Sequence, residues 1–123
     1  MKVGDKMQIL FLVLNETEYL DDILAAFVEI GVKGATIIDS QGMGRALATN
    51  PDQQLPLFGY LRNLMDGVHP YNKTIFTLID SQELTDKAIK AVKDIVGDIN
   101  RPGVGLMFTM PVGSVYGIGS GKK

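Results

Sequence analysis

Two stretches rich in glycine and arginine contain the residues best suited to bind a ligand. The first, Gly42-Met43-Gly44-Arg45, directly follows a predicted strand, and the second, Arg101-Pro102-Gly103-Val104-Gly105, precedes another. Glycines let backbone amides approach an anion closely, and a guanidinium forms paired hydrogen bonds with phosphate or carboxylate. Either stretch alone is more typical of a tight turn, but their presence together in a small protein favours an anion-binding site.

The remaining reactive side chains form no catalytic or metal-binding pattern. The chain has no cysteine and one histidine, His69, so disulfides and thiolate chemistry are excluded and one chain lacks the usual ligands of a transition metal. The serines have no histidine at a spacing typical of a nucleophilic triad. We therefore expect a protein that is not an enzyme and that has neither a metal site nor a required cofactor.

Composition limits the class of protein. The chain has 123 residues, 46% of them hydrophobic and 21% charged, with a net charge of −2, which predicts one domain spanning residues 1–123. No basic patch is present to bind nucleic acid. The longest apolar run, Ile9–Leu14, is far shorter than the roughly 20 residues that span a bilayer, and no secretory signal precedes it. We expect a cytoplasmic protein without direct membrane insertion.

Hydrophobic patterns predict the elements that position the two glycine stretches. Runs of apolar and β-branched residues predict four strands and a short fifth one, at Gln8–Leu14, Ala35–Asp39, Lys73–Ile79, Leu106–Met110 and Val112–Ile118. Two amphipathic helices are predicted from apolar residues at helical spacing: Leu20, Ile23, Leu24, Phe27 and Val28, then Leu84, Ala88, Val92, Ile95 and Val96.

The helix ends are predicted from their capping residues. Asn15 or Thr17 could cap the start of the first helix, and Asp80 or Ser81 the start of the second. Gly31 and Gly97 could end these two helices. The resulting order βαββαβ predicts an α+β, ferredoxin-like sandwich with both helices on one face of an antiparallel sheet. Because Gln8–Leu14 and Lys73–Ile79 are apolar on both sides, we expect other subunits to cover the second face. A loop folded over the sheet of a single chain is the alternative.

The connection between the second and third strands, residues 40–72, is unusually long. Loops beyond about 12–15 residues in compact domains are usually functional or disordered. Within this one, Leu57, Tyr60, Leu61 and Leu64 recur at helical spacing and predict a short amphipathic helix over Leu55–Met65. We interpret these four side chains as a surface that binds a partner protein.

Both glycine stretches belong to longer motifs. Gly31-x-x-Gly34-x-Thr36 followed after five residues by Gly42-x-Gly44-Arg45 resembles, without a gap, a segment of the PII signal-transduction proteins (nitrogen regulatory protein P-II family). Gly103-Val-Gly105-Leu-Met-Phe108-Thr-Met-Pro111-Val112 resembles the Gly-Asp-Gly-Lys-Ile-Phe-x-x-Pro-Val motif of the same family. The resemblance extends over roughly residues 7–120.

The resemblance implies a trimer of ferredoxin-like subunits that binds ATP, ADP or 2-oxoglutarate in clefts between subunits. It also implies that the long loop, called the T-loop in that family, acts on a target such as an enzyme, a transcription regulator or a membrane transporter. By position, Thr36, Gly42, Gly44 and Arg45 would form one wall of the cleft, with Gly103 and Gly105 on the opposing loop.

Several family residues are replaced in this chain. The phosphate-binding lysine of the second motif corresponds to Leu106, two C-terminal arginines correspond to Gly117 and Gly119, and a glutamine of the Mg²⁺ site corresponds to Ala46. Each missing charged contact would remove about 1.5–3 kcal/mol of binding free energy. We therefore predict a divergent PII-like sensor whose ligand is an adenine nucleotide with few phosphates. A ligand-free protein-interaction module and a metal-tolerance protein of the CutA type are the alternatives.

Overall fold

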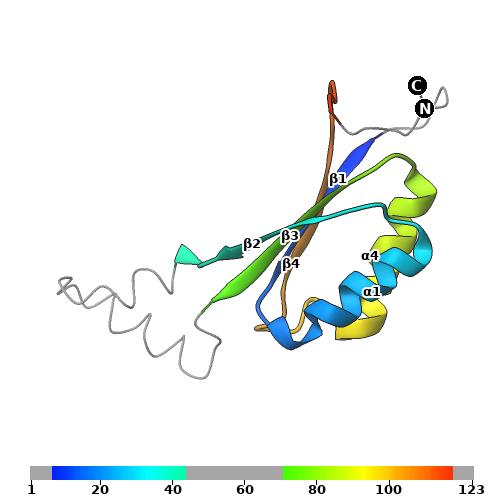
Figure 1. The fold of residues 1–123 in the computed structure, drawn as a ribbon. Coiled ribbons are helices and arrows are strands. Elements are labelled where there is room, and N and C mark those ends of the chain that lie inside the picture. The colour runs from blue at the N-terminus through cyan, green and yellow to red at the C-terminus, as the bar shows by residue number, and fades with distance from the viewer. Residues whose placement is uncertain (1–6, 44–70, 118–123) are drawn as a thin grey trace.

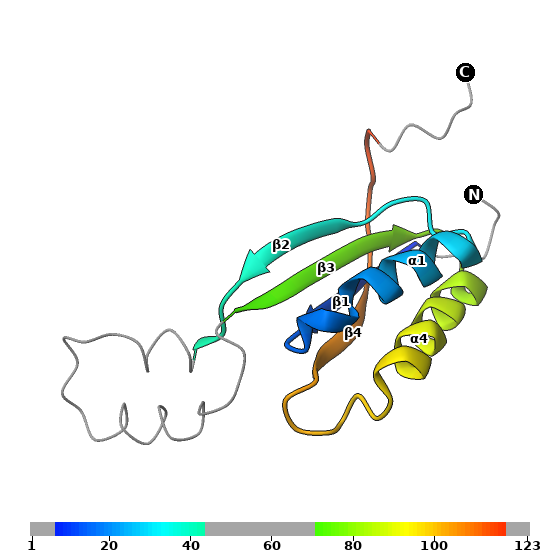
Figure 2. The same ribbon diagram turned by 60° about the horizontal axis from the view of Figure 1, so that its bottom comes forward.

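In the part of the chain that the structure describes, four antiparallel strands form one sheet, and two helices cover one of its faces. The computed structural model describes residues 7–43 and 71–117. In chain order the elements are β1 (Gln8–Leu14), a 3-10 turn (Thr17–Tyr19), α1 (Leu20–Ile30), β2 (Thr36–Ser40), β3 (Asn72–Ile79), α4 (Gln82–Val96) and β4 (Gly105–Pro111). The strand order is β2-β3-β1-β4, and Figures 1 and 2 show α1 and α4 side by side on the same face of the sheet. This is the predicted ferredoxin-like arrangement.

The core lies between the helices and the sheet because alternate strand residues point toward the helices. In β1 these are the buried Leu10, Leu12 and Leu14. Register places Leu12 opposite both Ile75 of β3 and Met107 of β4, so one layer of apolar side chains crosses the three strands. Each buried leucine of β1 contributes about 1.5–3 kcal/mol to folding.

The helices contribute the other half of the core. Ile23 and Phe27 of α1 are buried, whereas Val28 is 75% exposed, so the apolar stripe predicted for this helix is too wide. Val28 is one residue, or about 100°, further around the helix than Phe27, and this rotation turns it away from the sheet. In α4 the predicted positions Ala88, Val92 and Val96 are buried, together with Thr85. The hydroxyl of Thr85 donates a 2.9 Å hydrogen bond to the carbonyl oxygen of Ser81, which explains why a polar residue is tolerated there.

The capping predictions are confirmed at three of the four helix ends. Ser81 caps α4 by accepting a 3.1 Å hydrogen bond from the backbone N–H of Leu84. Gly31 ends α1 with a φ of +103°, and Gly97 ends α4 with a φ of +81°, as glycine permits. The start of α1 differs, because a 3-10 turn precedes the helix and Tyr19 is its N-cap without a side-chain hydrogen bond. The predicted cap by Asn15 or Thr17 is therefore wrong.

β1 has the predicted boundaries, the other three strands differ from the predictions by one residue at one or both ends, and the short fifth strand is absent from the described residues. β2 begins at Thr36, one residue later than predicted, because pairing with β3 starts with Thr36 opposite Phe76. Residues 112–117 form no strand. The backbone N–H of Val112 donates a 3.2 Å hydrogen bond to the oxygen of Met7, beyond the end of β1, and no described strand continues there to pair with the following residues.

The second face of the sheet is apolar, and no helix of the described residues covers it (Figure 2). Phe76, Phe11 and Phe108 lie in one row across three strands, with ring centroids 5.6 Å and 4.9 Å apart. Phe108 is 39% exposed. The other apolar residues of this uncovered face are Ile9, Val13, Ile38, Leu78, Leu106 and Met110. A continuous apolar surface of this kind marks an interaction site.

Most of the long connection, residues 44–70, lies outside the described residues. The predicted amphipathic helix with Leu57, Tyr60, Leu61 and Leu64 falls in that range, as do Gly44 and Arg45 of the first glycine stretch. The assignment of these residues to a partner-binding surface and to a ligand wall stays a prediction.

Candidate functional site

The described residues of the first ligand-binding group lie along the β2 edge of the sheet. Thr36 begins β2, and Gly42 and Met43 follow its last residue, Ser40; all three predicted site residues are exposed. A Cβ atom at Gly42 would meet nothing within 4 Å, so packing of the described residues does not require glycine at this position. Its presence is compatible with the predicted approach of a ligand to the backbone.

A hollow of about 470 Å³ adjoins this edge, between the α1–β2 connection and the end of β3. Thr36 and Gly34 lie on one side of it, and Leu78 lies on another. Lys33 and Asp80 are the charged side chains of its lining. Its volume falls in the range of small-molecule sites, and its mixture of apolar walls with few polar groups is typical of them. Of this lining, the sequence assigns only Thr36 to a ligand site, although Gly31 and Gly34 belong to the same motif.

A polar cluster fastens the base of the long connection. The Ser40 hydroxyl is 2.8 Å from the hydroxyl of Thr74 and hydrogen-bonded to the Asn72 side chain, whose amide donates a 3.1 Å hydrogen bond to Asn15 Oδ1. Asp39 forms an ion pair with Lys73, its neighbour across the two strands. These contacts hold the two ends of the connection together. The Asp39–Lys73 pair could have been predicted from the sequence, because opposite charges stand at the end of one predicted strand and at the start of the next.

Arg101, the cation of the second glycine stretch, forms a paired hydrogen bond with Glu16 within the same chain. Its two terminal nitrogens donate to the two carboxylate oxygens at 3.0 Å and 2.9 Å, and one of them also donates to the carbonyl oxygen of Val96 at 3.4 Å. The hydrogen bond with Glu16 raises the pKa of Arg101 above its usual value. The carboxylate therefore occupies one edge of the guanidinium that sequence analysis assigned to an anionic ligand.

The structure explains the two glycines of this stretch, Gly103 and Gly105, in different ways. Gly103 has a φ of +87° but open space around it. Gly105 has a φ of +153°, and a Cβ atom there would lie 2.2 Å from the carbonyl oxygen of Val13. Glycine at position 105 is therefore required by the close approach of β4 to β1, whether or not a ligand binds.

The two predicted groups lie at opposite edges of the sheet. Thr36, Gly42 and Met43 belong to the β2 side, whereas Arg101, Gly103 and Gly105 precede β4. Three strand spacings, about 14 Å, separate the two edge strands. One chain does not bring the groups together, and the assignment of each residue to a ligand site stays a prediction.

Other kinds of site find no support in the residues that the structure describes. Within residues 7–43 and 71–117 no three or more histidine and acidic residues gather as metal ligands would. None of the helices in that part of the chain combines the length and apolarity needed to cross a membrane.

The protein family described as "Nitrogen regulatory protein P-II" matches residues 9–122 of this chain. The chain belongs to the P-II family. P-II proteins are regulators rather than enzymes, and the resemblance predicted from the two glycine motifs is confirmed. Comparison with curated protein sequences gives no match.

Solved P-II structures share this fold at low sequence identity. The Bacillus subtilis GlnK–ATP complex is 16% identical, with a TM-score of 0.57 over 87% of this chain and 84% of that one. The Arabidopsis thaliana PII protein bound to citrate is 15% identical, with a TM-score of 0.63 over 99% and 92% of the two chains. These similarities confirm the α+β, ferredoxin-like fold.

Proposed function

We propose that this P-II protein is a trimeric sensor that binds a small ligand, an adenine nucleotide with few phosphates, in clefts between its subunits. In the cytoplasm, this protein would use residues 40–72 to control a partner protein, either an enzyme or a membrane transporter, in response to the ligand. Membership of a family of regulatory proteins supports the general role, and the ATP complex of GlnK supports the class of ligand.

The separation of the two ligand-binding groups is the observation that carries this proposal. Thr36 and Gly42 lie at the β2 edge, and Gly103 lies beside the β4 edge of the same sheet. A head-to-tail interface would place the β2 edge of one copy beside the β4 edge of the next, and such an interface closes into a ring when the rotation allows. The same arrangement would cover the uncovered face, whose aromatic row is otherwise partly exposed to water.

The charges around the two groups support a ligand with few phosphates. Leu106, where the family has a lysine, is 58% exposed and supplies no cation. Arg101 is hydrogen-bonded to Glu16, so a phosphate would have to compete with a carboxylate already in place. Lys33, in the lining of the hollow beside Thr36, is a cation on the β2 side. This arrangement favours a singly or doubly charged ligand over a triphosphate.

Thermal unfolding in the presence of ligands tests the proposal. Adenosine, AMP, ADP, ATP, a cyclic nucleotide and 2-oxoglutarate are compared at one protein concentration. A ligand present at a hundred times its Kd stabilises the folded state by about 2.7 kcal/mol, a shift of several degrees in Tm. We expect adenine compounds to raise Tm, with AMP at least as effective as ATP. Stabilisation by none of them would refute nucleotide sensing while leaving the fold unaffected.

A ligand-free interaction module is the second candidate, and the Glu16–Arg101 pair favours it. With this guanidinium already paired to a carboxylate, the second glycine stretch could serve only to turn the chain into β4. In that case no compound of the panel would raise Tm, yet the protein would still capture its partner. Deleting residues 55–65 should abolish that capture in a pull-down, and unchanged capture would contradict the assignment of this segment to partner binding.

A further inference from the structure

The turn that follows β1 lies between two parts of the molecule that are distant in sequence. β1 is bordered by β3 on one side and by β4 on the other. Its last residue, Leu14, pairs with Lys73 of β3 and with Gly105 of β4. The next two residues, Asn15 and Glu16, therefore join the start of β3, where the long connection ends, to the second glycine stretch.

Glu16 holds this turn to the second glycine stretch. Its carboxylate oxygens accept hydrogen bonds from Arg101 at 3.0 Å and 2.9 Å, and its backbone N–H donates to the carbonyl oxygen of Val104 at 3.4 Å. The side chain of Glu16 is 20% exposed and that of Arg101 45% exposed, so the pair is open to solvent. A phosphate group can accept the same two hydrogen bonds from a guanidinium, and it can therefore replace the carboxylate without losing either of them.

Asn15 holds the same turn to the base of the long connection. Its Oδ1 atom accepts a 3.1 Å hydrogen bond from the side-chain amide of Asn72, and Asn72 is in turn hydrogen-bonded to the hydroxyl of Ser40. Ser40 ends β2 and Asn72 begins β3, so these two residues flank the connection. Adjacent residues of one turn thus contact Arg101 and the base of the connection.

The turn is a single tight bend at Glu16. The backbone N–H of Thr17 donates a 3.0 Å hydrogen bond to the carbonyl oxygen of Asn15. With a φ of −85° and a ψ of 79° at Glu16, this is an inverse γ-turn, which is common where a strand ends. Such a turn fixes the backbone of its central residue alone, so the anchoring of the Glu16 side chain affects where Asn15 lies.

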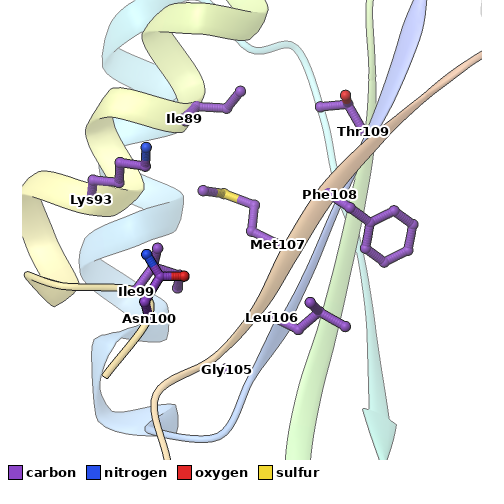
Figure 3. A pocket seen from close by; sticks show the side chains of 9 residues that line it. All are labelled: Ile89, Lys93, Ile99, Asn100, Gly105, Leu106, Met107, Phe108 and Thr109. Atoms are coloured by element: carbon purple, nitrogen blue, oxygen red, sulfur yellow. The ribbon is translucent and has the colours of Figure 1, made fainter. Parts of the chain in front are cut away.

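Open space adjoins the stretch that contains Arg101. Asn100 precedes Arg101 and Gly105 ends the same stretch, and both line a cavity of about 340 Å³ between α4 and β4 (Figure 3). Gly105 also belongs to the group assigned to the proposed cleft between subunits. A ligand bound in that cleft would therefore lie beside the stretch that carries Arg101.

We propose that the turn Asn15–Glu16 couples ligand binding to the base of the long connection. The phosphate of the ligand would replace the Glu16 carboxylate on Arg101, and the released turn would give up the hydrogen bond between Asn15 and Asn72. This coupling rests on the proposed function, which assigns Arg101 to the ligand. It deepens that function by giving the regulatory contact through which a ligand on the β4 side acts on residues that flank the connection.

NMR of side-chain N–H signals tests the coupling. The probes are AMP and inorganic pyrophosphate, added at constant ionic strength to the full chain in its native assembly. We expect both to shift the Nε–H signal of Arg101 and, over the same concentration range, the side-chain amide signals of Asn15 and Asn72. Glu16→Ala removes the competing carboxylate, so both probes should bind roughly tenfold more tightly. Its Asn72 signals should already be displaced before any probe is added.

Asp21→Ala is the matched control, since it removes an equal charge from the exposed first turn of α1. Its probe affinities and its Asn72 signals should equal those of the native protein. Arg101→Met is the second variant. It breaks the same contact from the other side, so its Asn72 signals should be displaced without a probe and should not respond when one is added.

Three results would overturn the coupling. The first is a native protein whose Asn72 signals stay in place while Arg101 responds, and the second is equal pyrophosphate affinity in the Glu16→Ala and Asp21→Ala variants. The third is no response of Arg101 to pyrophosphate up to about 10 mM. A screen in which no adenine compound raises Tm would refute nucleotide sensing but leave the expected pyrophosphate responses unchanged. Adenine compounds that raise Tm without moving the Asn72 signals would refute the coupling alone.

Discussion

Replacing Gly105 with alanine should destabilise the protein because the new methyl group has no room. The Cβ atom would lie 2.2 Å from the Val13 carbonyl oxygen and 3.3 Å from the Cα atom of Leu14. These are backbone atoms of the neighbouring strand, so no side-chain rotation relieves the contact. The first residue of β4 must move away from Leu14, the residue with which it pairs.

The magnitude follows from three contributions. An unfavourable positive φ costs about 1–3 kcal/mol for a residue other than glycine. Displacing the start of β4 weakens one or two ladder hydrogen bonds, each worth about 1 kcal/mol. Alanine lowers the entropy of the unfolded chain and thereby offsets about 0.4–1 kcal/mol. We expect Gly105→Ala to lower the free energy of unfolding by about 2–4 kcal/mol.

Two other glycines are matched controls. Gly103 has a positive φ but open space, so Gly103→Ala should cost about 1 kcal/mol, from strain alone. Gly34 has neither a positive φ nor a close neighbour, and Gly34→Ala should be neutral or slightly stabilising.

Urea unfolding followed by circular dichroism measures all three glycine variants. One fixed protein concentration is needed because assembly couples stability to concentration. We expect Gly105→Ala to lower the free energy of unfolding most, Gly103→Ala less, and Gly34→Ala least. Equal losses at positions 105 and 103 would refute the role of the close approach to Val13.

Two further outcomes are expected from other parts of the fold. Ser81→Ala removes the side-chain acceptor for the Leu84 N–H and should lower the free energy of unfolding by about 1 kcal/mol in the same urea assay. Ser81→Asp keeps an acceptor and should retain most of this stability. Phe108→Asp places a charge on the uncovered face and should convert the proposed trimer, with three times the 13.4 kDa mass of the chain, to a monomer in light scattering. Val28→Asp, on the exposed side of α1, should leave the mass unchanged, and a trimer of the Phe108→Asp variant would contradict the proposed use of this face.

The predictions succeeded where local chemistry decides the structure. The apolar run Gln8–Leu14 has the boundaries of β1, and the Ser81 cap and the Gly31 and Gly97 helix ends each depend on residues within one turn. The start of α1 was predicted incorrectly because Asn15 donates its N–H to Val104 and accepts from Asn72, contacts remote in sequence that compete with capping. Val28 was assigned to the buried stripe because periodicity alone does not specify how wide the contact with the sheet is.

The sequence by itself determined the order of elements, the family and the apolar character of both faces of the sheet, because these follow from residue types at fixed spacing. Only the tertiary structure revealed that Glu16 holds Arg101 and that Gly105 must be glycine to pass Val13. It also placed the two predicted ligand-binding groups at opposite edges of one sheet. Each of these features joins residues distant along the chain, and their proximity depends on strand order and register, which no local pattern encodes.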